Sequence, residues 1–275
     1  MCVTEKRKTR IIALCGKGGV GKTSIAAAVT KILTGDPRAR VLAIDADPAV
    51  GLASALDISV RCTVDDVRNL LIKKIESREG GDKKQIISLL DYELTNALEE
   101  RGNLAFLAIG RPEMEGCYCQ VNEILKDIIT ALSSNFDYVV IDGEAGIEQI
   151  NRRVMESVTH LILVSDQSAK GVGVIATLKK VAVDAVHYER VGYIINRIRD
   201  EQELEKMQLP EDMEFLGSIP EDETIRNSDI EGKSLLMLPD CAALDSIRRC
   251  LETMEILPHK VLNSKCTCSS VINYE

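Results

Sequence analysis

The sequence of 275 residues is poor in aromatic side chains and in positive charge. It has no tryptophan, and aromatic residues make up 3% of the chain. Proteins that hold single-stranded nucleic acid by stacking need many more of them. Its 34 Lys and Arg are outnumbered by 43 Asp and Glu, so the formal net charge is −9. Because such a chain repels phosphate backbones, we expect no nucleic-acid partner.

Long hydrophobic runs are also absent. The first apolar run after the basic start covers Ile11–Cys15, which is too short for a signal-peptide core or a membrane span. Beyond Leu257 the only basic residues are Lys260 and Lys265, without an amphipathic stripe. Nine cysteines, an odd number, fit a disulfide framework poorly and are expected to be reduced thiols. We therefore expect a cytoplasmic protein with no membrane contact.

The hydrophobic pattern predicts a doubly wound α/β fold with a mostly parallel sheet and helices on both faces. Near-continuous aliphatic runs separated by helical periodicity are typical of strands buried on both sides. The charged stretch 72–84 predicts a solvated loop between two helices. We expect residues 1–255 to form one domain and 256–275 a flexible tail. The predicted strands are Ile11–Cys15, Val41–Ile44, Leu104–Ile109, Tyr138–Ile141, Leu161–Val164, Val191–Ile195 and Phe215–Ile219.

Between the first predicted strand and an Ala-rich helix lies a phosphate-binding loop of the pattern G-x-x-x-x-G-K-[ST]. Its glycines allow successive N–H groups to converge on phosphate oxygens, and the following helix directs its positive end at the same anion. Lys22 can reach the terminal phosphates of ATP, and the Thr23 hydroxyl can coordinate Mg²⁺. The residues expected to bind the nucleotide here are Gly16, Lys17, Gly18, Gly19, Val20, Gly21, Lys22, Thr23 and Ser24.

Three aspartates follow two of the predicted strands. Asp45 and Asp47 come directly after the second strand, where doubly wound sheets bind ligands. Asp142 ends the fourth strand, which is the Walker B arrangement that holds Mg²⁺ through water. The sequence therefore predicts that Thr23 and Asp142 hold Mg²⁺ directly or through water.

Two cysteines, Cys117 and Cys119, stand one residue apart at the start of a predicted helix. The helix dipole favours their thiolate forms. Two ligands do not close a metal site, but a homodimer supplies four if the pairs meet on its two-fold axis. Four thiolates suit Zn²⁺, Ni²⁺ or an iron–sulfur cluster. The alternative is a pair of thiols with no metal role.

A second lysine in the loop, Lys17 of KGGVGKT, gives the sequence its resemblance to a known family. Together with GRPEMEGCYCQVNEIL and DGEAGIEQINRR, this deviant loop resembles the CooC-type ATPases over roughly residues 10–255. These ATPases are P-loop NTPases of the SIMIBI type, in the superfamily of the nitrogenase iron protein and the septum-placement and chromosome-partitioning ATPases.

The resemblance implies an ATP-sandwich homodimer that delivers nickel to carbon monoxide dehydrogenase or acetyl-CoA synthase. Asp45 would hold Mg²⁺ directly or through water. Lys17 would reach the phosphates of the partner's ATP, and Asp47 would orient the attacking water. With Lys22, these two form the expected catalytic set. Cys117 and Cys119 would hold Ni²⁺ or Zn²⁺ at the dimer interface.

Two later segments resemble the base-recognition segments of the superfamily. One contains Asn196 and Arg197, and the other contains Pro220. The side chain of Asn196 offers both a donor and an acceptor to the edge of adenine.

Two other functions stay open. An ATP-dependent electron donor like the nitrogenase iron protein would need a second cluster cysteine after the fourth strand, and residues 142–155 contain none. A non-catalytic metal-buffering protein would bind nucleotide only as a structural ligand. The sequence does not assign a role to Cys266 and Cys268.

Overall fold

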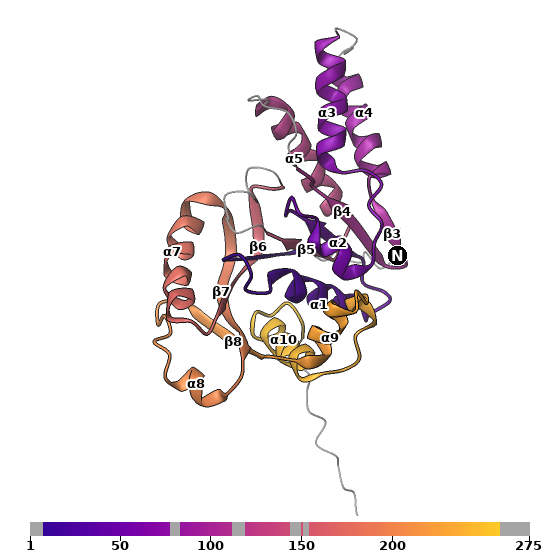
Figure 1. Cartoon of the computed structure of the whole chain (residues 1–275). Helices are drawn as coiled ribbons and strands as arrows, with labels where there is room; N and C mark the ends of the chain where they lie inside the picture. Colours follow the sequence, from indigo (N-terminus) through magenta and orange to yellow (C-terminus); the bar gives the residue numbers. More distant parts are fainter. Residues whose placement is uncertain (1–7, 78–82, 112–118, 144–149, 151–153, 259–275) are drawn as a thin grey trace, which may run out of the picture.

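The computed structural model describes residues 8–77, 83–111, 119–143, 150 and 154–258. Within them, one sheet has the strand order β3-β4-β2-β5-β1-β6-β7-β8 (Figure 1). All neighbouring strands are parallel except β3 and β4. The predicted doubly wound fold is therefore confirmed. The strands are β1 (Arg10–Gly16), β2 (Val41–Asp45), β3 (Glu99–Arg101), β4 (Leu104–Ala108), β5 (Tyr138–Asp142), β6 (Ser157–Asp166), β7 (His187–Ile198) and β8 (Glu214–Pro220).

Helices cover both faces of the sheet because successive strand residues alternate between them. Ile12 and Leu14 of β1 pack in one core, whereas Ala13 and Cys15 pack in the other. The first core includes α1, α2 and α10, and the second includes α3, α4, α5 and α7. The helices are α1 (Lys22–Thr34), α2 (Gly51–Leu56), α3 (Val64–Glu76), α4 (Lys83–Asn96), α5 (Cys119–Ser133), α7 (Ala169–Ala185), α8 (Glu201–Glu205), α9 (Glu223–Ile230), the 3₁₀ turn η1 (Leu235–Met237) and α10 (Ala242–Thr253).

No helix among the described residues has both the length and the apolar character needed to cross a membrane. After α10 the chain still contributes to the core, because Ile256 is fully buried. Of the predicted tail, 256–275, residues 259–275 lie outside the described residues.

The connection between β2 and β4 carries a pair of helices that projects away from the sheet (Figure 1). α3 continues to Glu76 and α4 begins at Lys83, so both helices extend into the stretch 72–84 that the charge pattern predicts as a loop. The prediction is too long at both ends because an amphipathic helix tolerates charge on its solvent face. Val67 and Leu71 of α3 and Leu90 of α4 supply the buried face.

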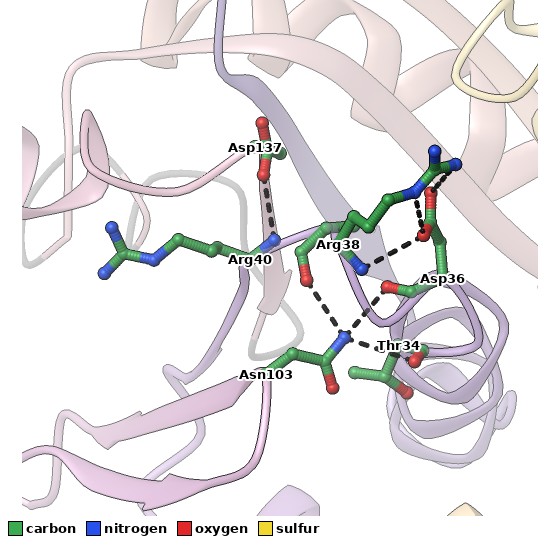
Figure 2. A network of polar contacts seen from close by, with 7 residues as sticks. Thr34, Asp36, Arg38, Arg40, Asn103 and Asp137 are labelled. Atoms are coloured by element: carbon green, nitrogen blue, oxygen red, sulfur yellow. Dashed lines mark hydrogen bonds and ion pairs between the residues drawn. The ribbon is translucent and has the colours of Figure 1, made fainter.

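At the amino ends of the strands, one side chain fixes the turn between α1 and β2 (Figure 2). The Nδ2 group of Asn103 donates to the carbonyl oxygens of Thr34, Asp36 and Ala39 at 2.9–3.2 Å. The Arg40 N–H donates to Asp137 Oδ2 at 2.8 Å, which ties the same turn to the start of β5. The end of α1 that lies away from the phosphate loop is thus anchored to the sheet.

Candidate functional site

The predicted phosphate loop connects the carboxyl end of β1 to α1. Gly16 packs so closely on β6 that a Cβ there would lie 2.2 Å from the Val164 carbonyl oxygen. Gly21 has a φ of 91°, a conformation that favours glycine, and immediately precedes the first residue of α1. Lys17 is exposed, whereas Val20 and Lys22 are buried. The loop therefore presents the N-terminus of α1 at the carboxyl edge of the sheet, where an anion is stabilised.

Three side chains donate hydrogen bonds to carbonyl groups of this loop. Lys22 Nζ lies 3.1 Å from the Lys17 oxygen. From the end of β7, Asn196 Nδ2 donates to the Val20 oxygen at 2.8 Å, and Arg197 Nη1 donates to the Gly19 oxygen at 3.1 Å. Carbonyl oxygens repel phosphate, so their engagement by side chains suits a loop that binds anions through N–H groups.

Asp45 and Asp142 lie side by side at the carboxyl edge, because they are register partners on β2 and β5. Asp142 is 1% exposed, and among the described residues neither of its carboxylate oxygens has a hydrogen-bond partner. Burial raises the pKa of Asp142 to about 7, and the nearby Thr23 hydroxyl only partly offsets this. The structure thus holds, next to the phosphate loop, a buried carboxylate that lacks a hydrogen-bond partner in the described ranges.

The carboxylate of Asp45 is used differently from that of Asp142. Oδ2 accepts from the N–H groups of Leu52 and Ala53 at 2.8 and 3.3 Å, and Oδ1 accepts from the Asp47 N–H at 3.1 Å. Burial raises the pKa of Asp45 to about 6 despite these donors. Asp45 therefore holds the turn that carries Asp47 and stabilises the start of α2, a role that the sequence does not reveal. Its place near Mg²⁺ stays a prediction.

Asp47 itself lies in that turn, half-buried, and its Oδ1 accepts from the Ala49 N–H at 2.9 Å. Its negative charge contributes to the raised pKa values of both Asp45 and Asp142. The carboxylates of Asp45, Asp47 and Asp142 therefore repel one another at the carboxyl edge of the sheet. A cation there would relieve their mutual repulsion.

Mg²⁺ fits these residues. The buried Asp142 carboxylate and the Thr23 hydroxyl are oxygen ligands of the kind that Mg²⁺ prefers. No group of three His, Cys, Asp or Glu side chains in the described ranges is placed to hold a metal ion by itself. Water and phosphate oxygens would thus complete the shell, as is usual for this ion.

A cavity of about 290 Å³ opens beside the start of α1. It brings together all three residues predicted for base recognition, Asn196, Arg197 and Pro220, with Gly21 and Ser24 of the loop region. Sequence reasoning missed the wall that α9 contributes, because no motif marks it. The further residues that line the cavity are Ile25, Ile219, Glu221, Asp222, Ile225, Arg226, Asp229 and Ile247.

Asp166 is a second residue that sequence reasoning missed. It ends β6 at the same edge, and the Ser168 side chain and N–H donate to its Oδ1 at 2.5 and 2.9 Å. These bonds, together with the positive charges of Lys17 and Arg197, lower the pKa of Asp166. Its position after an apolar strand, like that of Asp142, was the available signal.

The structure describes the predicted metal-binding pair, Cys117 and Cys119, only in part. Cys117 lies outside the described residues, and of Cys119 only the backbone is described, as the first residue of α5. The predicted helix that follows is confirmed, with Val121, Leu125 and Ile129 buried on one face. Cys15, Cys62, Cys241 and Cys250 are free thiols. Metal binding at Cys117 and Cys119 stays a prediction.

Comparison with known proteins places these features in context. The family model of the CobQ/CobB/MinD/ParA nucleotide binding domain matches residues 11–236. The chain is 32% identical to an uncharacterised ATP-binding protein of Methanocaldococcus jannaschii, over 93% of this chain and 99% of that protein. It is 27% identical to the carbon monoxide dehydrogenase accessory protein CooC of Rhodospirillum rubrum, over 84% of this chain and 91% of the other.

A solved structure supports the same fold. The septum site-determining protein MinD of Pyrococcus horikoshii, complexed with Mg-ADP, matches with a TM-score of 0.58 and 23% sequence identity. The match covers 90% of this chain and 96% of that one.

Proposed function

Because the chain belongs to the CobQ/CobB/MinD/ParA family of nucleotide-binding domains, we propose that it is an ATPase that dimerises on ATP and delivers nickel to a metalloenzyme. The observation that carries the ATPase part is the buried Asp142 carboxylate beside the phosphate loop, which has no hydrogen-bond partner among the described residues. The nickel part is supported by the Cys117 and Cys119 pair and by the similarity to CooC.

Each part of the nucleotide has a proposed binding group. Lys22 binds the β- and γ-phosphates, and the N–H groups of the loop and of the first turn of α1 bind phosphate oxygens. Thr23 and Asp142 hold Mg²⁺, with Asp45 close by. When bound, this ion neutralises charge that develops on the phosphate oxygens. The adenine lies in the 290 Å³ cavity beside Asn196, Arg197 and Pro220.

Hydrolysis then requires a positioned water and a charge for the transition state. Asp47, which the Asp45 carboxylate holds through its N–H group, orients the water. Lys17 is exposed at the mouth of the loop, so it can extend to ATP bound by a second copy. A positive charge supplied in this way makes hydrolysis depend on dimerisation, as an arginine finger does.

Lys17→Ala is expected to bind one ATP per chain yet fail to dimerise on ATP. The loop keeps its N–H groups and Lys22, so the intrinsic site survives, while the contact across the interface is lost. Light scattering with and without Mg-ATP measures the mass in solution. Lys180→Ala, which removes an exposed lysine of α7, is the matched control. ATP-dependent dimerisation of Lys17→Ala at the wild-type level would refute the role of Lys17 across the interface.

The nickel cargo is proposed to lie between two copies of the chain. Each copy contributes Cys117 and Cys119, and four thiolates on the two-fold axis form one site. ATP binding and hydrolysis switch the dimer between two arrangements and so change the distances among the thiolates. The recipient is proposed to be carbon monoxide dehydrogenase or acetyl-CoA synthase, since the relative CooC is an accessory protein of the former.

Metal analysis of the anaerobically purified protein, with and without ATP, tests this function. We expect one Ni²⁺ or Zn²⁺ per two chains, together with measurable ATP turnover. Cys117→Ser removes two of four ligands from a symmetric site and should nearly abolish metal binding. The double change of Cys266 and Cys268 to serine is the control and should leave the tight site intact.

Other results would favour other functions. One metal per chain that survives Cys117→Ser would contradict the shared site. A metal-loaded dimer without ATP turnover would indicate a metal buffer. A brown protein containing iron and sulfide would indicate an electron donor.

A further inference from the structure

We propose that Asn196 and Arg197 are positioning residues that clamp the phosphate loop in its anion-binding shape, in addition to any contact they make with the base. This inference rests on the proposed function, because it assumes that the loop binds the phosphates of ATP. In this role the two side chains at the end of β7 bind the backbone of the loop and need not touch the nucleotide.

The contact of Asn196 is buried on both sides. Asn196 is 7% exposed and its acceptor residue Val20 is 2% exposed, so their 2.8 Å hydrogen bond is shielded from water. A bond of this kind is stronger than one at the surface, and its loss leaves a buried carbonyl without a partner. Asn196 also approaches Gly21 so closely that a Cβ there would lie 2.5 Å from Nδ2. The amide therefore packs against the loop as well as binding it.

The backbone of β7 is irregular at Arg197, which makes the second contact to the loop. The pairing of β7 with β8 shifts register between Asn196 and Ile198, which leaves Arg197 as the extra residue of a bulge. Arg197 also has a φ of 61°, an unfavourable value for a residue with a side chain. Bulges redirect side chains at functional sites. Here the redirected guanidinium donates to the Gly19 oxygen at 3.1 Å.

These two contacts differ from the third side-chain contact to the loop. Lys22 donates to the Lys17 oxygen with the same ammonium group that is proposed to bind phosphate, so this bond belongs to the phosphate site itself. Asn196 and Arg197 can keep their bonds to Val20 and Gly19 whether or not phosphate is bound. The loop is thus arranged before the anion arrives, which lowers the entropic cost of binding it.

Inorganic tripolyphosphate with Mg²⁺ tests the clamp, because this probe has phosphates but no base or ribose. Arg197→Gly removes the guanidinium while tolerating the positive φ. We expect its affinity for tripolyphosphate, measured by calorimetry, to fall on the order of tenfold. Asn196→Ala should lose at least as much, since its bond is buried. Arg197→Lys keeps a charged donor and should recover part of the affinity. Arg199→Gly, also near the end of β7 but paired with Glu221, is the control and should bind as wild type does.

The outcomes separate the clamp from base recognition. If both variants bind tripolyphosphate like wild type and lose affinity only for ATP, the residues contact the base alone and the clamp is refuted. Because Asn196→Ala can unfold the site, the deciding variant is Arg197→Gly, provided that its circular dichroism spectrum is unchanged. A wild-type protein that binds neither Mg-ATP nor tripolyphosphate would instead contradict the proposed function, and the clamp with it.

Discussion

Lys22→Ala is expected to reduce the affinity for ATP on the order of 100-fold or more. Lys22 is 8% exposed, and the Lys17 carbonyl oxygen holds its ammonium group at the loop, where it is proposed to bind the terminal phosphates. Its removal deletes charge-assisted hydrogen bonds to two phosphates, at about 1.5–3 kcal/mol each. Equilibrium binding of a fluorescent ATP analogue measures the loss.

The matched control for this change is Lys31→Ala on the same helix. Lys31 lies in the last turn of α1 and donates to the Leu236 oxygen, away from the phosphate loop. It should bind ATP as wild type does, which separates loss of the phosphate contact from loss of helix stability. Near-normal ATP affinity in Lys22→Ala would contradict the proposed site.

Asp47→Asn is expected to bind ATP and to dimerise, yet to hydrolyse ATP about 10²–10⁴-fold more slowly, the usual range for loss of a positioned acid or base. Asparagine keeps an oxygen for the Ala49 N–H, so the turn after β2 retains its hydrogen bond while the negative charge is lost. Single-turnover measurements of phosphate release isolate the hydrolytic step.

Two further variants calibrate that result. Asp47→Ala removes the same charge and also the bond to Ala49, so it should hydrolyse no faster than Asp47→Asn. Asp184→Asn, at an exposed position of α7, should show wild-type turnover. If Asp47→Asn retains normal turnover, the water is oriented by another group, and Asp45 is the first to examine.

The sequence predicts every strand of the described sheet except β3, which lies at one of its edges. All seven predicted strands are confirmed, because strands buried on both faces need continuous apolar runs. β3 is not predicted: its residues Glu99–Arg101 are charged and form a short antiparallel edge strand with little burial. β6 starts at Ser157, earlier than the predicted Leu161, because its first residues pair with β7 without a continuous apolar pattern.

For the candidate site, the sequence locates residues but not their contacts. The loop motif and the strand-end aspartates are local signals, and the structure brings Asp45 and Asp142 together through the register of β2 and β5. That the Asp45 carboxylate binds N–H groups at the start of α2 depends on how the following turn folds back. The bonds from Asn196 and Arg197 to the loop join residues more than 170 positions apart and leave no trace in local patterns.

The central place of β1 in the sheet has a consequence for how the protein is made. The ribosome produces this strand first, yet its two neighbours, β5 and β6, are built from residues 138–142 and 157–166. During translation the nascent chain therefore carries an apolar strand whose hydrogen-bonding edges are both open until most of the domain has emerged. Such non-local pairing slows folding and favours aggregation. The proposed support of the phosphate loop comes later still, since Arg197 is added after both neighbouring strands. If the loop needs this support, a nascent chain is expected to bind ATP only after β7 has been synthesised.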